Sequence, residues 1–320
     1  MQKEIILSPL QGYTDYVYRN VYASCFPYID SFITPFLACE NDGTIRKSKR
    51  KDISAENNSV VKPIAQILPG TVDETKILCQ LLIENNYTEL NLNIGCPFPP
   101  VVNKGRGCGL LTHPEQVDKI LRSIFNNFSG KVSVKTRTGL NNHNELYKII
   151  PILHAYPISE IIIHARYGKQ LYKGSSDVNE FLKYKDLIQI PLVYNGDIDN
   201  HNYLEFTANK LKETKKIAIG RGILQDPFLP ARIKGIAILN EKQQFINFIT
   251  CLHREYLDHT ETPKHAHTKL ILLWEYMSAY LKPELKAAKK IRKTTNLTTY
   301  NETIKSLIKE HYRISDPFGS

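Results

Sequence analysis

Residues Glu89–Pro97 read ELNLNIGCP, a short strand-like run that breaks into Gly-Cys-Pro. Runs of similar length, rich in Ile, Val and Leu, recur at Glu4–Ser8, Ser31–Pro35, Pro63–Leu68, Val132–Thr136, Glu160–His164, Pro191–Asn195 and Ile217–Gly220. Near-continuous apolar runs of this kind are typical of strands that are buried on both faces. The sequence therefore predicts eight strands.

Helix-period segments separate most of these runs. Apolar residues recur at helical spacing in Asp73–Asn86, Pro114–Phe128, Asn144–Ala155 and Val178–Ile188. Alternating strands and helices favour an α/β fold, a (β/α)8 TIM barrel over residues 1–238. The alternative is a doubly wound open sheet, which is weakened because no GxGxxG follows the first strand.

The strand pattern stops near Ala237–Glu241. Beyond that point Lys242–Leu257, Lys264–Tyr280, Pro283–Arg292 and Glu302–Tyr312 have helical periodicity. We therefore expect an all-α helical domain over residues 239–320.

The chain has 320 residues and a formal net charge of +10. A basic excess of this size favours a polyanionic partner, nucleic acid first. Cations gather in Arg46–Lys51 and Lys286–Lys293, although each cluster alone is equally well a solvated surface.

The six cysteines form no CxxC pair, which argues against a zinc site or a dithiol motif, and we expect no metal. No apolar run reaches the length of a membrane helix, and the N-terminus lacks the features of a signal peptide. These observations predict a cytoplasmic protein with no membrane partner.

Polar residues cluster at the predicted carboxyl ends of the strands, where barrels carry their active sites. These ends hold Gln66, Asn93 and Cys96, Lys135 and Arg137, His164 with Tyr172 beyond it, Asn195-Gly196-Asp197, and Gly220-Arg221. One such residue is usually a satisfied structural group. Several converging ends predict a functional site.

The last two strands indicate what this site binds. Barrels often hold a phosphate with the loops that follow strands seven and eight, and Gly196 and Gly220 would let backbone N–H groups approach an anion. Each glycine alone could mark a plain turn, but the pair favours a phosphate-bearing ligand. If that ligand is a flavin, Lys135 would stabilise the negative charge of the reduced ring. The alternative for Lys135 is a pair with a carboxylate inside the site.

Seven segments then carry a family resemblance: Leu7–Arg19 (LSPLQGYTDYVYR), the strand with Gln66, Leu90–Pro97 (LNLNIGCP), Val134–Gly139 (VKTRTG), Ile162–Gly174 (IIHARYGKQLYKG), Val193–Ile198 (VYNGDI) and Ala218–Pro227 (AIGRGILQDP). In this order, across the whole predicted barrel, they resemble the tRNA-dihydrouridine synthases. One departure is Leu10, where the family commonly has Met. Another is Cys108, where a smaller residue is common, and we expect this thiol to be a buried packing residue.

The resemblance implies tightly bound FMN, with NADPH as the reductant. It implies reduction of the C5=C6 bond of a specific tRNA uridine, with hydride passing from reduced FMN to C6 and a proton from Cys96 to C5. This acid role agrees with the ordinary pKa of a thiol, about 8.5, which keeps it protonated at pH 7. The cofactor residues carried over are Pro9, Leu10, Gln11, Gln66, Lys135, His164, Asn195, Gly196, Asp197, Gly220 and Arg221. Those for the base or its nucleotide are Asn93, Arg137 and Tyr172. Lys269, on a helical segment outside these motifs, is a further candidate for the surface that meets tRNA.

The expected partners are tRNA and NADPH, with no obligatory protein partner and a monomeric state. We also expect Lys104 and Arg106 to meet phosphate. Two alternatives stay open, an FMN oxidoreductase of a free small molecule and a tRNA-binding relative that has lost catalysis. The second predicts damage at Cys96 or Lys135, and both residues are present.

Overall fold

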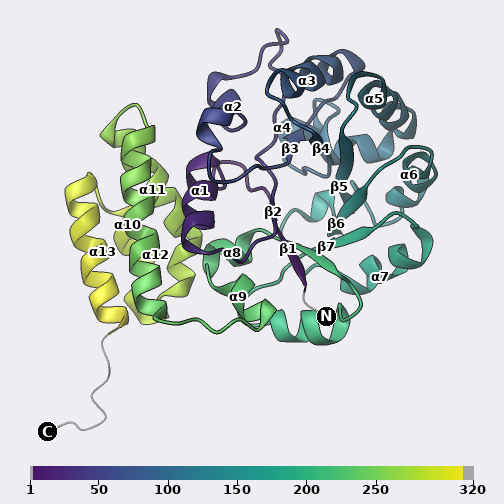
Figure 1. The fold of residues 1–320 in the computed structure, drawn as a ribbon. Helices are drawn as coiled ribbons and strands as arrows, with labels where there is room; N and C mark the ends of the chain where they lie inside the picture. The colour runs from purple at the N-terminus through teal and green to yellow at the C-terminus, as the bar shows by residue number, and fades with distance from the viewer. Residues whose placement is uncertain (1–2, 313–320) are drawn as a thin grey trace, which may run out of the picture.

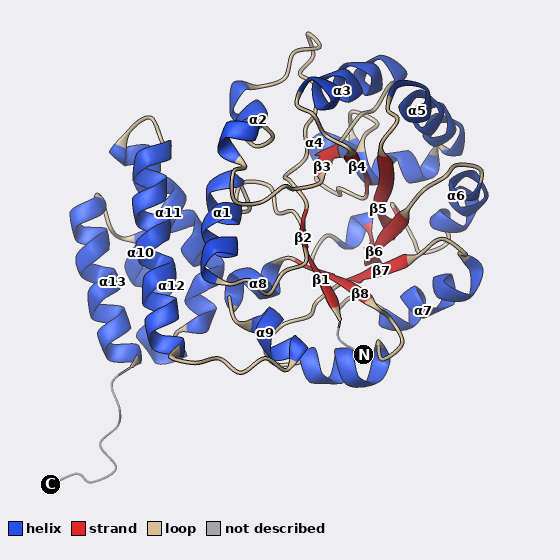
Figure 2. Ribbon diagram, in the orientation of Figure 1, coloured by secondary structure: helices blue, strands red, loops and turns tan. Residues whose placement is uncertain are grey.

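The computed structural model describes residues 3–312, and within them eight parallel strands form one curled sheet (Figure 2). The strands are β1 (Glu4–Leu7), β2 (Ser31–Phe32), β3 (Ala65–Ile67), β4 (Glu89–Ile94), β5 (Lys131–Gly139), β6 (Glu160–Tyr167), β7 (Leu192–Asn195) and β8 (Lys216–Ile219). Their order is β2-β1-β8-β7-β6-β5-β4-β3. Single bridges, Ile33 to Ile64 and Leu37 to Ile67, join the two edges and complete the barrel. The predicted TIM barrel is confirmed.

Helices surround the strands (Figure 1). The longer ones are α1 (Tyr16–Cys25), α3 (Val72–Glu84), α5 (Pro114–Asn127), α6 (Glu145–His154) and α7 (Val178–Leu187). Shorter ones are α2 (Lys47–Lys51), α4 (Pro99–Val102), α8 (Arg221–Gln225) and α9 (Leu229–Lys234). Helix α3 begins before the predicted start because Thr71, whose hydroxyl accepts from the N–H of Glu74, caps it.

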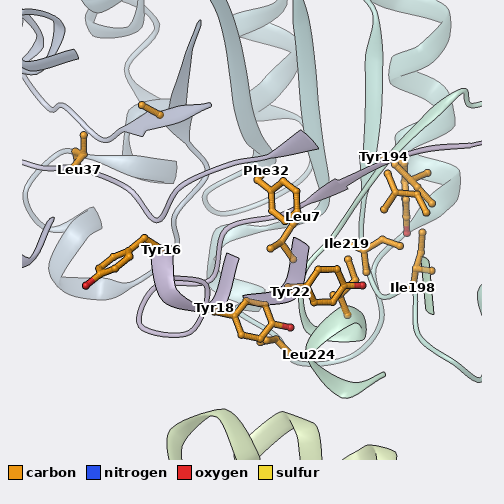
Figure 3. Packing of buried hydrophobic residues seen from close by; sticks show 14 of the residues in the cluster. Leu7, Tyr16, Tyr18, Tyr22, Phe32, Leu37, Tyr194, Ile198, Ile219 and Leu224 are labelled. Atoms are coloured by element: carbon orange, nitrogen blue, oxygen red, sulfur yellow. The ribbon is translucent and has the colours of Figure 1, made fainter. Parts of the chain in front are cut away.

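Alternation along the strands sorts their side chains between two layers. Outward-facing residues pack against the helices in one large apolar cluster, part of which, including Leu7, Tyr22 and Ile219, is seen in Figure 3. A small separate cluster holds Ile6, Ile33, Ile162, Val193 and Ala218. The strands β3 to β5 instead contribute a chain of polar groups, in which Gln66 donates to Asn91 (2.7 Å) and Asn91 to Ser133 (2.8 Å). This polar side of the barrel lies directly beneath the site described below.

Four helices follow the barrel within the described residues: α10 (Glu241–His259), α11 (Pro263–Met277), α12 (Ala287–Arg292) and α13 (Leu297–His311). Helix α10 packs on α1 (Figure 1), where the ring of Phe248 lies 5.0 Å from Phe26 and 6.0 Å from Tyr18 and Tyr22. In α11, the indole of Trp274 donates to the Tyr300 hydroxyl of α13 (2.8 Å). Residues 313–320 of the predicted helical domain lie outside the described part.

Between residues 3 and 312, no helix combines the length and the apolar character that crossing a membrane would require.

Candidate active site

Two adjoining cavities, of about 110 and 70 Å³, lie at the carboxyl ends of the strands. Both are lined by Pro9, Leu10, Lys135, His164 and Tyr172. The larger also has Gln11, Gln66, Asn93, Cys96 and Arg137 in its wall, and the smaller has Asn195, Gly196, Asp197, Gly220 and Arg221. The structure thus brings together every predicted site residue except Lys269.

The turn that carries Cys96 is fixed from below by Asn93. The Asn93 carbonyl oxygen accepts from the N–H groups of Gly95 and Cys96, both at 2.9 Å, while its amide nitrogen donates to Gln66 (2.8 Å). The turn passes so close to β5 that a Cβ on Gly95 would lie 2.7 Å from the carbonyl carbon of Thr136. Burial raises the pKa of the Cys96 thiol, so this group is protonated at pH 7. Cys96 thus carries a protonated thiol on a backbone turn that is held in place.

Cys108 differs from Cys96 in its surroundings. It is fully buried, its Sγ lies 2.6 Å from where a Cβ on Gly168 would be, and burial raises the pKa of its thiol to about 12. The prediction that Cys108 is a packing residue is confirmed.

Arg106, in the same loop, does not reach the surface. Its buried guanidinium pairs with Glu74 (2.5 Å) and donates to the Cys39 carbonyl (2.9 Å). The prediction that Arg106 meets phosphate is therefore wrong, because its charge is used to fix the loop. Lys104 is exposed and donates to Asn41.

Lys135 and His164 project from β5 and β6 into both cavities. Burial, with repulsion from Arg137, lowers the pKa of Lys135 to about 8. Among the described residues no carboxylate contributes to this shift, so a Lys–carboxylate pair does not explain Lys135. Burial and the nearby cations lower the pKa of His164 well below its usual value. The imidazole is therefore neutral at pH 7.

Asp197 is held in a network of cations and N–H groups. Its carboxylate accepts from Arg166, from Arg221 (2.5 Å) and from the N–H of Ser176 (2.8 Å). Arg166 is buried and also donates to the carbonyls of Lys173 (2.6 Å) and Gly174 (2.7 Å). Arg166 is absent from the predicted site residues, although the HAR sequence of its motif contains it. It links the loop after β7 to the loop that carries Tyr172.

Tyr172 lies between two arginines. The guanidinium of Arg221 is 4.6 Å and that of Arg137 is 5.5 Å from the centre of its ring, and half of its side-chain surface is exposed. Arg137 donates to the carbonyls of Tyr167 and Leu171, both at 2.9 Å, but its buried Nη2 has no partner among the described residues. This nitrogen is a donor beside Cys96 that a ligand carbonyl can satisfy.

This site lies within a chain whose residues 6–314 match the family described as "Dihydrouridine synthase (Dus)". The chain belongs to the dihydrouridine synthase family.

Relatives of this dihydrouridine synthase chain include "tRNA-dihydrouridine synthase B" of Vibrio parahaemolyticus, 27% identical over 208 residues, or 64% of this chain and 63% of the relative. The match thus spans slightly less than two thirds of that relative. A "Probable tRNA-dihydrouridine synthase" of Helicobacter pylori is 25% identical, with 97% of this chain and 92% of the relative covered. Among solved structures, the old yellow enzyme homologue of Zymomonas mobilis has a TM-score of 0.52 at 12% identity, covering 83% of this chain and 94% of that one. This last likeness shows the barrel fold.

One predicted residue of this chain lies apart from the site. Lys269, on α11, pairs with Asp15 (3.0 Å) and lines a different cleft of about 230 Å³. The same cleft is lined by Lys47, Lys49 and Lys51 of α2 and by His265. The basic segment Arg46–Lys51 and the helix α11 therefore meet, although they are far apart in the sequence.

Proposed function

We propose that this chain is a tRNA-dihydrouridine synthase, an FMN enzyme that reduces the C5=C6 bond of a specific uridine in tRNA with NADPH as reductant. One observation carries the proposal. Cys96, whose thiol burial keeps protonated, lines the same cavity as the cation Lys135 at the mouth of the barrel. The adjoining cavity is lined by Arg221 and by the loops that follow β7 and β8. Family membership supports it.

The residues present fit FMN. At one end, Arg221 and the loops at Gly196 and Gly220 would hold the phosphate. Gly196 packs so closely that a Cβ would lie 2.3 Å from the Tyr194 hydroxyl. At the other end, Lys135, Gln66, His164 and the segment Pro9–Gln11 would hold the ring. When bound, FMN supplies the hydride for C6 of the uracil.

Each protein group then has a task that its environment supports. Lys135, with its pKa of about 8, is mostly charged at pH 7 and offsets negative charge on the reduced ring. His164 is neutral and can hydrogen-bond to the flavin without adding charge. Cys96 delivers its proton to C5 of the uracil. The unpaired Nη2 of Arg137 donates to a carbonyl oxygen of the base, and Tyr172 contacts the same nucleotide.

For tRNA, we propose a surface that includes residues 239–320 as a binding domain. Lys269 and the lysines of α2 line one cleft, and Lys286–Lys293 add further cations on and around α12. Phosphate contacts on such a surface offset the few kcal/mol that turning a uridine out of its stack costs. We propose that the enzyme acts as a monomer in the cytoplasm, without an obligatory protein partner.

The test begins with a strain that lacks this chain. Dihydrouridine is mapped position by position in its tRNA, with complementation by wild type, by Cys96→Ala and by Cys251→Ala, which removes a half-buried thiol of α10. We expect at least one position to lose dihydrouridine and to regain it with wild type and Cys251→Ala only. Purified Cys96→Ala should keep its flavin absorbance. Unchanged tRNA in the deletion strain would contradict the proposal, and so would full activity of Cys96→Ala.

The purified enzyme separates this function from its alternatives. With reduced FMN it should convert uridine in an unmodified tRNA transcript but leave free uridine unchanged. Comparing NADPH with NADH as reductant then tests the nucleotide preference. Reduction of free uridine alone would instead favour an oxidoreductase of small molecules.

A further inference from the structure

Phe98 stands two residues beyond Cys96 and is 59% exposed, although it is a large apolar side chain. The ring belongs to neither hydrophobic cluster of the described residues. A single exposed apolar side chain is ordinary on a protein surface. The exposure of Phe98 alone therefore does not indicate a function, and its location in the structure decides.

The backbone at Phe98 is fixed by its neighbours. The Phe98 carbonyl accepts from the N–H groups of Val101 (2.8 Å) and Val102 (3.0 Å), so that Phe98 caps α4. Pro97, Pro99 and Pro100 surround it, and each fixes a φ angle. The backbone that carries the ring therefore has little conformational freedom to lose on binding.

The segment that carries the ring borders the larger cavity of the site. Phe98 directly follows Pro97, and both Cys96 and Pro97 are in the wall of the larger cavity. Phe36 lines the same cavity, and the ammonium of Lys49 lies 5.7 Å from the centre of its ring. An aromatic ring and a cation of α2 therefore lie at the cavity of Cys96, and Phe98 is exposed next to the wall of that cavity. This combination is the one with which proteins bind single-stranded nucleic acid.

We propose that Phe98 is a stacking site for the nucleobase next to the uridine that enters the cleft. The inference rests on the proposed function, because a polynucleotide substrate is what places a second base beside the reacting one. A uridine turned out of its stack leaves neighbouring bases with an exposed face. Stacking on Phe98 restores part of that lost contact, whatever the identity of the neighbouring base. Phe98 thus contributes affinity and orientation, whereas the chemistry stays with Cys96.

The test uses three variants of the full-length holoenzyme: Phe98→Ala, Phe98→Trp and, as the matched control, Leu204→Ala, which removes an exposed apolar side chain (64%) between β7 and β8. The dissociation constant and KM are measured with an unmodified tRNA transcript, and kcat at saturating transcript. We expect Phe98→Ala to raise both the dissociation constant and KM about 5- to 100-fold with kcat unchanged. Phe98→Trp should retain wild-type values, and so should Leu204→Ala. All variants should keep the wild-type melting temperature.

A second arm removes the proposed partner base. Transcripts carry an abasic nucleotide on either side of the uridine that wild type converts. One of the two should weaken wild-type binding as much as Phe98→Ala does, and Phe98→Ala should weaken binding of that transcript no further.

The outcomes separate the two proposals. Wild type that converts no uridine would overturn the proposed function. Wild type that converts uridine while Phe98→Ala binds tRNA equally well would overturn the stacking inference alone. A Phe98→Trp variant as weak as Phe98→Ala would also overturn it, because an aromatic face would then not be what the tRNA needs.

Discussion

Replacing Asp197 with Asn tests whether this residue contacts the phosphate of FMN or positions the residue that does. A carboxylate pressed directly against a phosphate would repel it, and Asp197→Asn would then tighten FMN binding. In the structure the carboxylate is instead shared between Arg166 and Arg221. We expect Asp197→Asn to weaken FMN binding, because Arg221 loses the group that holds it at the cavity.

The magnitude follows from the burial of the network. The Arg166 side chain is 1% exposed and that of Asp197 is 21% exposed. Removing one partner of a buried ion pair costs about 3–5 kcal/mol. Asn keeps one acceptor oxygen, and Arg166 keeps its bonds to the carbonyls of Lys173 and Gly174. We therefore expect a loss of roughly 2–3 kcal/mol in the free energy of unfolding, or roughly 3–5 °C in melting temperature for a chain of this size.

For FMN, the lost contribution is part of one charge-assisted hydrogen bond from Arg221. Because Arg221 is partly exposed and stays in place some of the time, we expect a dissociation constant on the order of 10-fold higher.

Two assays on the apoprotein separate these effects. Urea denaturation gives the stability, and quenching of flavin fluorescence during titration with FMN gives the affinity. Glu213→Gln is the control, because it breaks an exposed pair with Lys185 and should change neither quantity. Tighter FMN binding by Asp197→Asn, or unchanged stability, would refute the positioning role.

Three further predictions concern Cys96 and Gly95, in the turn after β4, and Lys135 of β5. Because burial raises the pKa of Cys96, iodoacetamide should alkylate it at pH 7.5 more slowly than free cysteine, as measured by peptide mass spectrometry; faster alkylation would contradict the acid role. Gly95→Ala should cost roughly 1–3 kcal/mol in urea denaturation, because its Cβ meets the β5 backbone, and an unchanged midpoint would show that the turn can shift freely. In the folded apoprotein the pKa of Lys135 is about 8, against an ordinary value of 10.5 for a solvated lysine, so its ammonium destabilises the fold at pH 7 and this cost disappears between pH 8 and 10.5. The stability that Lys135→Met gains over wild type should therefore be largest at pH 7 and shrink toward pH 10; a gain independent of pH would exclude this titration.

Strand β4 follows the sequence prediction at both ends, whereas β2 does not. In β4 the apolar run and the break at Gly95 both mark the boundaries. In β2 the run Ser31–Pro35 is equally apolar, but only Ser31 and Phe32 pair as a strand and Ile33 forms a single bridge. The apolar content of a segment predicts that it is buried, but it does not predict which of its backbone groups hydrogen-bond to a neighbouring strand.

The sequence pattern does not single out helix α1, because its buried face combines Val17 and Val21 with tyrosines and an arginine. It includes Tyr18, Tyr22 and Arg19, which hydropathy patterns do not count as core. Arg19 is buried because the carbonyls of Thr14 and Asp52 accept from its guanidinium. The packing of α10 on α1, through Phe248, covers Tyr18 and Tyr22 on this face.

The position of the site could be predicted from the sequence, but the division of labour within it could not. Residues that touch a ligand and residues that position them are of the same polar types, at the same strand ends. Asn93 was predicted to address the base, yet both ends of its amide already hold the turn of Cys96 and Gln66. Arg106 looked free for phosphate, yet Glu74, distant in sequence, neutralises it. Gln66 and Glu74 are distant from these residues in the sequence, so no local motif records their contacts.

Mutation can distinguish the residues that contact a ligand from the residues that position them. A group that only contacts a ligand changes turnover or affinity and leaves the free energy of unfolding nearly unchanged. A group such as Asn93, Asp197 or Arg166 is bonded to several parts of the backbone or to other side chains, so its loss must lower stability and ligand affinity together. Cys96, whose thiol holds no other element in place, should separate the two effects. The ratio of the loss in unfolding free energy to the loss in ligand affinity therefore assigns each polar residue of the cavity to one of these two roles.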